Sequence, residues 1–142
     1  MTSDRIARDY LEQAKARRIA VEALFGARAY AGVVRESHDV VELVLKGALR
    51  FVGVEPPKRH DTHDVVERFI ARFPDEWRRV IGELSGALTQ LAQDRAPAFY
   101  GREADDVPPS ELFGEADARR AMGIADRLLD LYTRLLGEAP RG

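Results

Sequence analysis

Apolar residues recur at intervals of three and four along almost the whole chain, the spacing that places them on one face of an α-helix. The clearest runs cover residues 6–25, 30–52, 65–70, 77–91 and 118–136. The alternating pattern of a half-buried β-strand appears nowhere. Because the connections are short, consecutive helices are expected to pack side by side in opposite directions. The sequence therefore predicts an all-α fold, an antiparallel up-and-down helical bundle of four to five helices.

Several residues predict where these helices begin and end. Gly26 is expected to end the first helix, and Asp61 or Thr62 to begin the third. Asp75 is expected to cap the fourth. Pro97 has no amide proton, and its ring clashes with the carbonyl four residues earlier. We therefore expect the fourth helix not to continue unbroken past Pro97.

Composition limits the class of protein. A chain of 142 residues with 45% hydrophobic and 32% charged residues is expected to form one domain, residues 1–142. A net charge of −2 gives no general attraction to nucleic acid, so such binding needs a local patch. The absence of cysteine excludes disulfides and thiol chemistry. No apolar run approaches the roughly 20 residues of a membrane helix, and residues 1–8 do not resemble a signal peptide. These features favour a cytoplasmic protein that does not bind membranes.

The second helical run combines a narrow charged stripe with an unusually wide apolar surface. At about 100° per residue, five charged side chains fall in one line: Arg35, Asp39, Glu42, Lys46 and Arg50. Apolar residues cover most of the remaining circumference, far more than the stripe of an ordinary surface helix. A domain of this size has little room for a fully central helix. We therefore expect a second copy of the chain to cover part of this surface in a homodimer.

Charged residues on these helices allow structural or ligand-binding roles. Glu42 and Lys46 have the favourable spacing of an ion pair, and Asp39 lies beside them. The alternative for this group is a surface that faces a ligand. Arg17 shares a face with apolar residues, so it is expected to form an ion pair or to extend its stem to solvent. A phosphate contact is the alternative for Arg17.

The segment His60-Asp61-Thr62-His63-Asp64 brings two histidines and two carboxylates close together in sequence. Such a set suggests a metal site. However, helix capping by Asp61 or Thr62 and the helix dipole at Asp64 account for the acidic residues. We therefore expect structural roles for His60 and Asp61, and no metal ion.

The region around Pro97 combines arginines with aromatic side chains. Arg95, Phe99, Tyr100 and Arg102 supply the guanidinium groups and rings that grip nucleotides or single-stranded nucleic acid. Alternatively, the two rings pack against the end of the bundle. The predicted ligand-binding residues are Lys46, Arg95, Tyr100 and Arg102. No phosphate-binding glycine loop, metalloprotease motif or nucleophile with a local base is present, so no cofactor is expected.

The order and spacing of several segments resemble those of the HEPN family (higher eukaryotes and prokaryotes nucleotide-binding), and the resemblance spans nearly the whole chain. They are Tyr30 with residues 36–49, residues 53–61, Ala98-Phe99-Tyr100-Gly101-Arg102-Glu103, residues 108–113 and residues 115–118. The resemblance implies a helical bundle that usually pairs as a dimer. It also implies a link to nucleic acid and nucleotides. Many members are metal-independent ribonucleases or toxins, often encoded beside a small nucleotidyltransferase partner.

The catalytic signature that the resemblance implies is an arginine followed, after four to six residues, by a histidine, with both subunits contributing. The histidines of this chain, His38, His60 and His63, have no arginine at the required distance upstream. Arg95 lies near the expected position, but Tyr100, Gly101 and Arg102 occupy the positions where histidine is required. A tyrosine with an ordinary pKa near 10 is a poor base at neutral pH. We therefore expect no catalytic residues of the family type.

The sequence supports a non-catalytic HEPN-type module that binds nucleotide or RNA, pairs with a nucleotidyltransferase partner, or does both. A second hypothesis is a metal-independent ribonuclease toxin in which the fold brings His60 or His63 near Arg95. A third is a purely structural dimerisation module.

Overall fold

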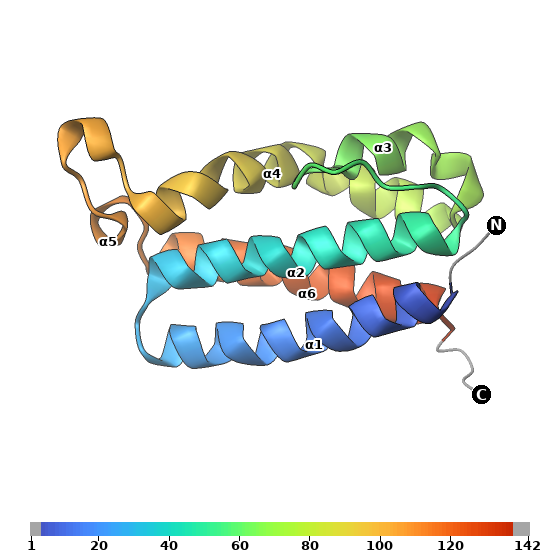
Figure 1. Ribbon diagram of the computed structural model, residues 1–142, viewed down its shortest axis with the longest axis horizontal. Helices are drawn as coiled ribbons and strands as arrows, with labels where there is room; N and C mark the ends of the chain where they lie inside the picture. Colours follow the sequence, from blue (N-terminus) through green and yellow to red (C-terminus); the bar gives the residue numbers. More distant parts are fainter. Residues whose placement is uncertain (1–3, 138–142) are drawn as a thin grey trace.

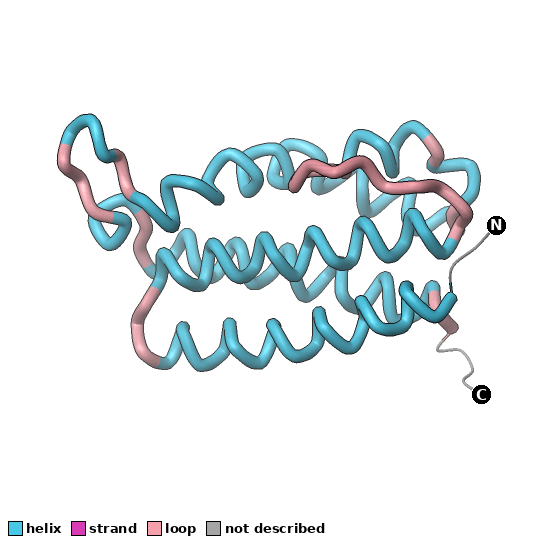
Figure 2. Tube along the Cα trace, in the orientation of Figure 1, coloured by secondary structure: helices cyan, strands magenta, loops and turns pink. Residues whose placement is uncertain are grey.

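A computed structural model describes residues 4–137 and shows an antiparallel bundle of four long helices (Figure 1). The long helices are α1 (Asp4–Gly26), α2 (Tyr30–Phe51), α4 (Asp75–Tyr100) and α6 (Glu115–Leu135). The short ones are α3 (His63–Arg68), η1 (Ile70–Arg72), η2 (Glu103–Asp105) and α5 (Pro109–Leu112). Each long helix runs opposite to the one before it, and residues 4–137 contain no named strand (Figure 2). The predicted all-α fold is confirmed.

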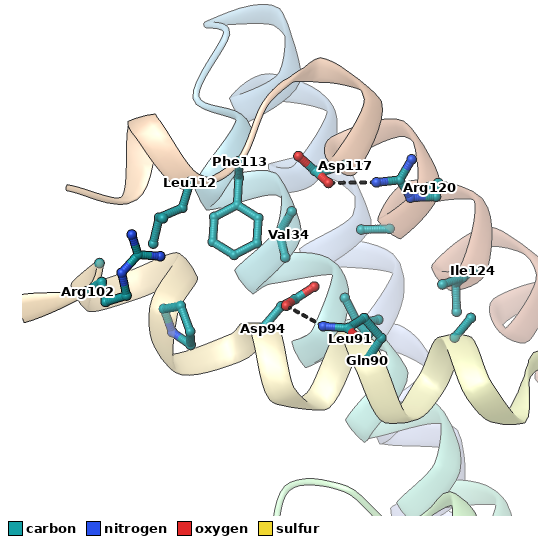
Figure 3. A pocket seen from close by; sticks show the side chains of 14 residues that line it. Val34, Gln90, Leu91, Asp94, Arg102, Leu112, Phe113, Asp117, Arg120 and Ile124 are labelled. Carbon is teal, nitrogen blue, oxygen red and sulfur yellow. Dashed lines mark hydrogen bonds and ion pairs between the residues drawn. The ribbon is translucent and has the colours of Figure 1, made fainter. Parts of the chain in front are cut away.

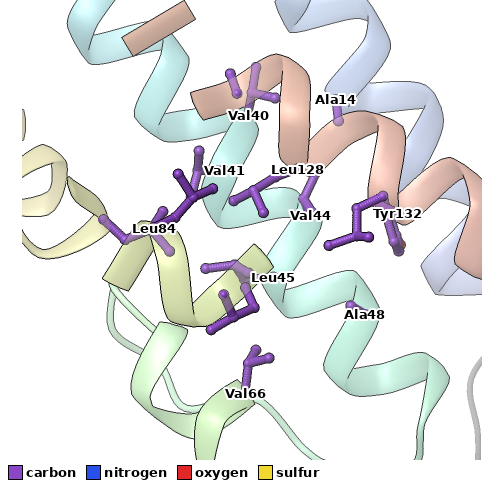
Figure 4. Packing of buried hydrophobic residues seen from close by; sticks show 14 of the residues in the cluster. Ala14, Val40, Val41, Val44, Leu45, Ala48, Val66, Leu84, Leu128 and Tyr132 are labelled. Carbon is purple, nitrogen blue, oxygen red and sulfur yellow. The ribbon is translucent and has the colours of Figure 1, made fainter. Parts of the chain in front are cut away.

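Helix α2 is the central helix of this bundle. Eleven of its residues are buried, and its side chains contact α1, α4 and α6 at once. In Figure 4, Val40, Val44 and Leu45 of α2 lie among side chains such as Leu84 of α4 and Leu128 of α6. The expectation that a chain of this size has no room for a central helix is therefore wrong. The wide apolar surface of α2 is covered within one chain, and it no longer argues for a second copy.

One large core cluster runs between the helices, completed by large side chains from α4 and α6, and a smaller separate cluster contains Val21, Val33 and Ala118. Trp77 and Tyr132 are its largest fully buried members, and Phe73 packs against Trp77 with ring centroids 4.8 Å apart. Burial of this apolar surface is the main force that holds the four helices together. None of the described helices has the length and hydropathy needed to cross a membrane.

Helix α4 does not stop at Pro97, as the sequence suggested. It continues to Tyr100, with Pro97 inside its last turn. A proline removes only one helical hydrogen bond, and a helix packed along its length tolerates that loss. The helix ends at Gly101, whose φ of 76° lies in the left-handed region. A Cβ at position 101 would also overlap the carbonyl oxygen of Val107, so this position requires glycine.

Two other helix starts differ from the expected capping. Thr62 precedes α3, but its side chain makes no capping hydrogen bond. Asp61 performs part of this role, because its Oδ1 accepts a hydrogen bond of 3.3 Å from the backbone N–H of His63. Asp75 is the first helical residue of α4 and Pro74 occupies the cap position, so the predicted Asp75 cap is wrong by one residue. The first helix ends at Gly26 as predicted.

The segment between α2 and α3 turns back along α2 (Figure 2). The backbone N–H of Val54 donates to the carbonyl of Leu49, and Gly53, with a φ of 86°, allows the reversal. This segment carries His60, and it therefore brings that histidine beside the charged stripe of α2.

Candidate functional site

The charged stripe of α2 (Arg35, Asp39, Glu42, Lys46 and Arg50) is only partly exposed. The side chains of Asp39 and Glu42 are each 19% exposed, and that of Lys46 is 18% exposed. Residues from α1, α4 and the segment after α2 contact the stripe and shield it from solvent. Charges held this far from water are costly unless they are paired. The stripe is therefore a constrained polar surface rather than an ordinary solvated helix face.

At one point of the stripe, Asp39 lies between two guanidinium groups. Its Oδ1 is 3.6 Å from Nη2 of Arg95 on α4, and its Oδ2 is 3.9 Å from Nη1 of Arg17 on α1. Arg17 also donates a hydrogen bond of 3.0 Å to Glu36. Three helices thus meet at Asp39 through opposite charges.

About one helical turn further along, Glu42 binds both Lys46 and His60. Its Oε2 is 3.0 Å from Nζ of Lys46, and its Oε1 is 3.0 Å from Nδ1 of His60. The structure therefore brings together five of the predicted residues, Arg17, Asp39, Glu42, Lys46 and His60, and joins them to Arg95.

His38, which lies beside Asp39 and Glu42 on α2, was not among the predicted site residues. Its side chain is 2% exposed, and its Nδ1 has no hydrogen-bond partner among the described residues. Burial lowers the pKa of His38 to about 4. The negative charge of Glu42 opposes this shift, and the positive charge of Arg95 adds to it. His38 is thus an uncharged imidazole near a guanidinium from another helix. In the sequence, His38 precedes Glu42 by four residues, a spacing that places two side chains on the same side of a helix. This spacing was the signal from which their proximity could have been predicted.

Six buried polar side-chain atoms of residues 4–137 have no hydrogen-bond partner, and most of them belong to α2. Among the described residues they are Arg35 Nε, Ser37 Oγ, His38 Nδ1, Arg50 Nε, Thr62 Oγ1 and Arg95 Nε. Four of these six belong to α2, and a fifth belongs to Arg95, which faces it. Native proteins pair nearly all such atoms with protein, water or ligand. Three of these atoms, the Nε atoms of Arg35, Arg50 and Arg95, belong to the stripe or to the helix that faces it.

Exposed aromatic rings lie at one end of the stripe. Phe99 and Tyr100 are 56% and 61% exposed, and their rings meet edge to face with centroids 4.7 Å apart. The guanidinium carbon of Arg35 is 4.1 Å from the centroid of the Phe99 ring. Neither ring fills the end of the bundle. The sequence analysis placed Arg35 in the stripe but did not connect it with Phe99, because that contact joins two helices.

Arg102 lies elsewhere. Its Nε donates to Asp105 at 2.8 Å, and its side chain lines a cavity of about 600 Å³ between α4, α5 and α6 (Figure 3). The cavity has mainly apolar walls, such as Leu91, Phe113 and Ile124. Two carboxylates on its wall have protein partners: Asp94 accepts from Gln90, and Asp117 pairs with Arg120. The predicted ligand-binding residues thus fall into two places.

Asp61 and His63 belong to a third place, at the start of α3. Nδ1 of His63 is 2.7 Å from Oδ1 of Asp61, and its Nε2 is 3.3 Å from the hydroxyl of Thr89 on α4. His63 is 7% exposed. These contacts fasten the start of α3 to α4, which is a structural role.

Comparison with known families identifies the domain. The model of the HEPN domain matches residues 7–135, nearly the whole chain. The chain belongs to the HEPN family. No curated protein and no solved structure matches it.

Within this HEPN domain, Arg95 has no histidine at the positions that the family signature requires. The structure nevertheless brings the charge of Arg95 close enough to the imidazole of His38 to affect its pKa. The two side chains come from different helices, so a search along the sequence could not pair them. Of the three histidines, His38 and His60 lie at the stripe and His63 does not.

Proposed function

We propose that this HEPN domain binds single-stranded RNA or a nucleotide along the charged stripe of α2 and does not cleave it. The observation that carries the proposal is the stacking of Arg35 on the exposed ring of Phe99, beside the exposed ring of Tyr100 and at the end of the charged stripe. Guanidinium groups recognise phosphate through paired N–H donors, and exposed rings stack on bases.

The burial of His38 supports binding without cleavage by this residue. Proton transfer in RNA cleavage needs an imidazole that reaches the ribose and titrates near neutral pH. His38 is buried, and burial lowers its pKa to about 4. It is therefore poorly suited to act as a base for an external substrate.

Fluorescence anisotropy with a short labelled single-stranded RNA tests the proposal. We expect binding at low salt that weakens as salt rises, because phosphate contacts release counterions. The double substitution Phe99→Ala and Tyr100→Ala is expected to weaken binding about 5- to 100-fold through loss of base stacking. Competition by AMP distinguishes a mononucleotide site from one that needs a longer strand.

Arg127→Ala is the matched control for arginine removal. Arg127 lies on α6 and pairs with Glu83 at 2.8 Å, away from the stripe. Its loss is expected to leave RNA affinity unchanged. Absence of binding at low salt, or equal affinity of the Phe99 and Tyr100 double variant, would contradict the proposal.

One observation favours the ribonuclease alternative. His60 is 60% exposed and hydrogen-bonded to Glu42, which also binds Lys46, so an accessible imidazole and a cation share one carboxylate. If this arrangement cleaves RNA, cleavage proceeds with EDTA present and His60→Ala abolishes it. Intact RNA after prolonged incubation removes this alternative.

The family resemblance also supports two protein partners, a second copy of this chain and a small nucleotidyltransferase. Light scattering after size exclusion tests the first, since a monomer at micromolar concentration contradicts a homodimer. A nucleotidyltransferase encoded in the neighbouring reading frame would support the second.

A further inference from the structure

Three potential metal ligands meet on α2 in a way the sequence analysis did not anticipate. His38, Asp39 and Glu42 each offer a ligand atom, and these atoms all lie within 4.8 Å of one another. Two atoms that bind one ion at about 2.1 Å lie at most about 4.2 Å apart. Small side-chain rotations would therefore bring the three atoms into coordination distance.

The buried imidazole of His38 is a second observation in favour of a site. His38 is only 2% exposed, yet its Nδ1 has no hydrogen-bond partner among the described residues. A buried imidazole without a hydrogen-bond partner is uncommon, and coordination of an ion by one of its ring nitrogens would give it a partner. The imidazole also contributes a ligand atom to the group that contains both carboxylates.

The carboxylate of Asp39 retains free coordination capacity as well. Its contacts with Arg95 and Arg17, at 3.6 and 3.9 Å, are longer than hydrogen bonds. They supply compensating charge without occupying the oxygen lone pairs at close range. A second imidazole lies beside the group, because Oε1 of Glu42 is 3.0 Å from Nδ1 of His60.

We propose that His38, Asp39 and Glu42 form a binding site for a divalent transition-metal ion, and that the exposed His60, which contacts Glu42 beside this group, moves in to supply a fourth ligand. Two imidazoles and two carboxylates suit Zn²⁺ and its neighbours such as Co²⁺ and Ni²⁺. Mg²⁺ and Ca²⁺ prefer sites made of oxygen atoms alone, so they are expected to bind far more weakly.

Neighbouring cations set the strength of this site. Lys46 lies 3.0 Å from Glu42, and an ion must displace or share this contact. Replacing Lys46 by the uncharged methionine removes a competitor for the carboxylate while retaining the length of the side chain. Lys46→Met is therefore expected to bind metal more tightly, whereas loss of a cation weakens RNA binding. Because the two expected effects are opposite, Lys46→Met tests metal binding separately from the proposed RNA binding.

Titration of untagged, EDTA-treated protein with Co²⁺ and Zn²⁺ tests the site. We expect one Co²⁺ per chain with visible absorption bands, and a matching Zn²⁺ affinity by calorimetry that Mg²⁺ does not reproduce. His38→Asn and Glu42→Gln are each expected to weaken binding at least about tenfold. Glu83→Gln, whose carboxylate pairs with Arg127 away from the stripe, is the control for loss of a carboxylate and leaves metal affinity unchanged.

Circular dichroism checks that each variant is folded. If His38→Asn does not fold, Glu42→Gln at its partly exposed position decides the question. The absence of Co²⁺ bands and Zn²⁺ heat overturns the proposal. Wild-type affinity in Glu42→Gln, or in folded His38→Asn, overturns it as well.

Discussion

The hydroxyl of Tyr132 on α6 occupies the space that a side chain at Gly47 of α2 would fill. Tyr132 is fully buried, and its hydroxyl donates a hydrogen bond to the backbone carbonyl of Ala7 on α1. One phenol group thus connects three of the four long helices. Gly47 allows this connection, because a Cβ there would overlap the phenol oxygen.

Gly47→Ala is expected to lower the free energy of unfolding by about 2 kcal/mol, because overpacking forces Tyr132 from its position. This cost exceeds the gain of about 1 kcal/mol that alanine brings to a helix. Gly82→Ala is the matched control, since a Cβ there meets nothing within 4 Å and the substitution should stabilise α4. Urea denaturation measures both, and an unchanged or raised stability in Gly47→Ala would show that the core can adjust.

Stability should fall at alkaline pH because of Tyr132. Burial raises the pKa of Tyr132 well above its ordinary value near 10. In the unfolded chain this tyrosine loses its proton near pH 10, while in the folded chain it keeps it. Its contribution is therefore complete below pH 10 and is lost as pH rises towards the folded pKa.

Urea denaturation from pH 7 to 11 checks this dependence against Tyr132→Phe. The variant is expected to lose about 1 kcal/mol at pH 7, because the hydrogen bond to Ala7 is gone. It should also show a shallower decline above pH 10. Parallel declines in the two proteins would assign the alkaline effect to other groups.

Pro97→Ala is expected to raise the free energy of unfolding by about 1 kcal/mol. The substitution restores an amide donor in the last turn of α4 and removes the ring from the carbonyl of Gln93. The gain is smaller than at a helix centre, because only this turn is affected. Thermal denaturation measures it, and a lower melting temperature would show that Pro97 has a packing role at the cavity wall that outweighs the hydrogen bond.

Two substitutions of Arg35 should separate its charge from its shape. Arg35→Lys keeps the charge but loses the planar group that stacks on Phe99, so RNA affinity should fall with an unchanged salt slope. Arg35→Gln removes the charge, and the salt slope should fall by about 0.7 for a single strand. Anisotropy titrations at several salt concentrations measure both quantities. Identical slopes in all three proteins would exclude a phosphate contact at Arg35.

The helices could be predicted from sequence because their signals are local. The apolar spacing of α1, α2 and α6 and the stop at Gly26 depend only on neighbouring residues. Pro97 misled the prediction because the packing of α4 outweighs one lost hydrogen bond. The central position of α2 was also missed. The width of its apolar surface is visible in sequence, but the identity of the helices that cover it is not.

The candidate site, too, could be predicted from sequence only where its contacts join residues close together in the chain. The line of charges on α2 follows from its helical period, and the Glu42–Lys46 pair is a neighbour contact. His38 was missed because the family signature directs attention to histidines that follow Arg95 in sequence. Its partners are defined by the packing of α2 against α4 and by burial, which no short sequence pattern contains.

Thr89 and Asp61 clamp His63 from both sides of its ring, and this clamp fixes the end of the segment that carries His60. The reach of His60 towards Glu42 is therefore governed by an anchor on a different helix. A substitution at Thr89, which lies well outside the charged stripe, would release His63 and loosen the segment that carries His60. The contact between His60 and Glu42 would then change, although the substituted residue does not touch the stripe.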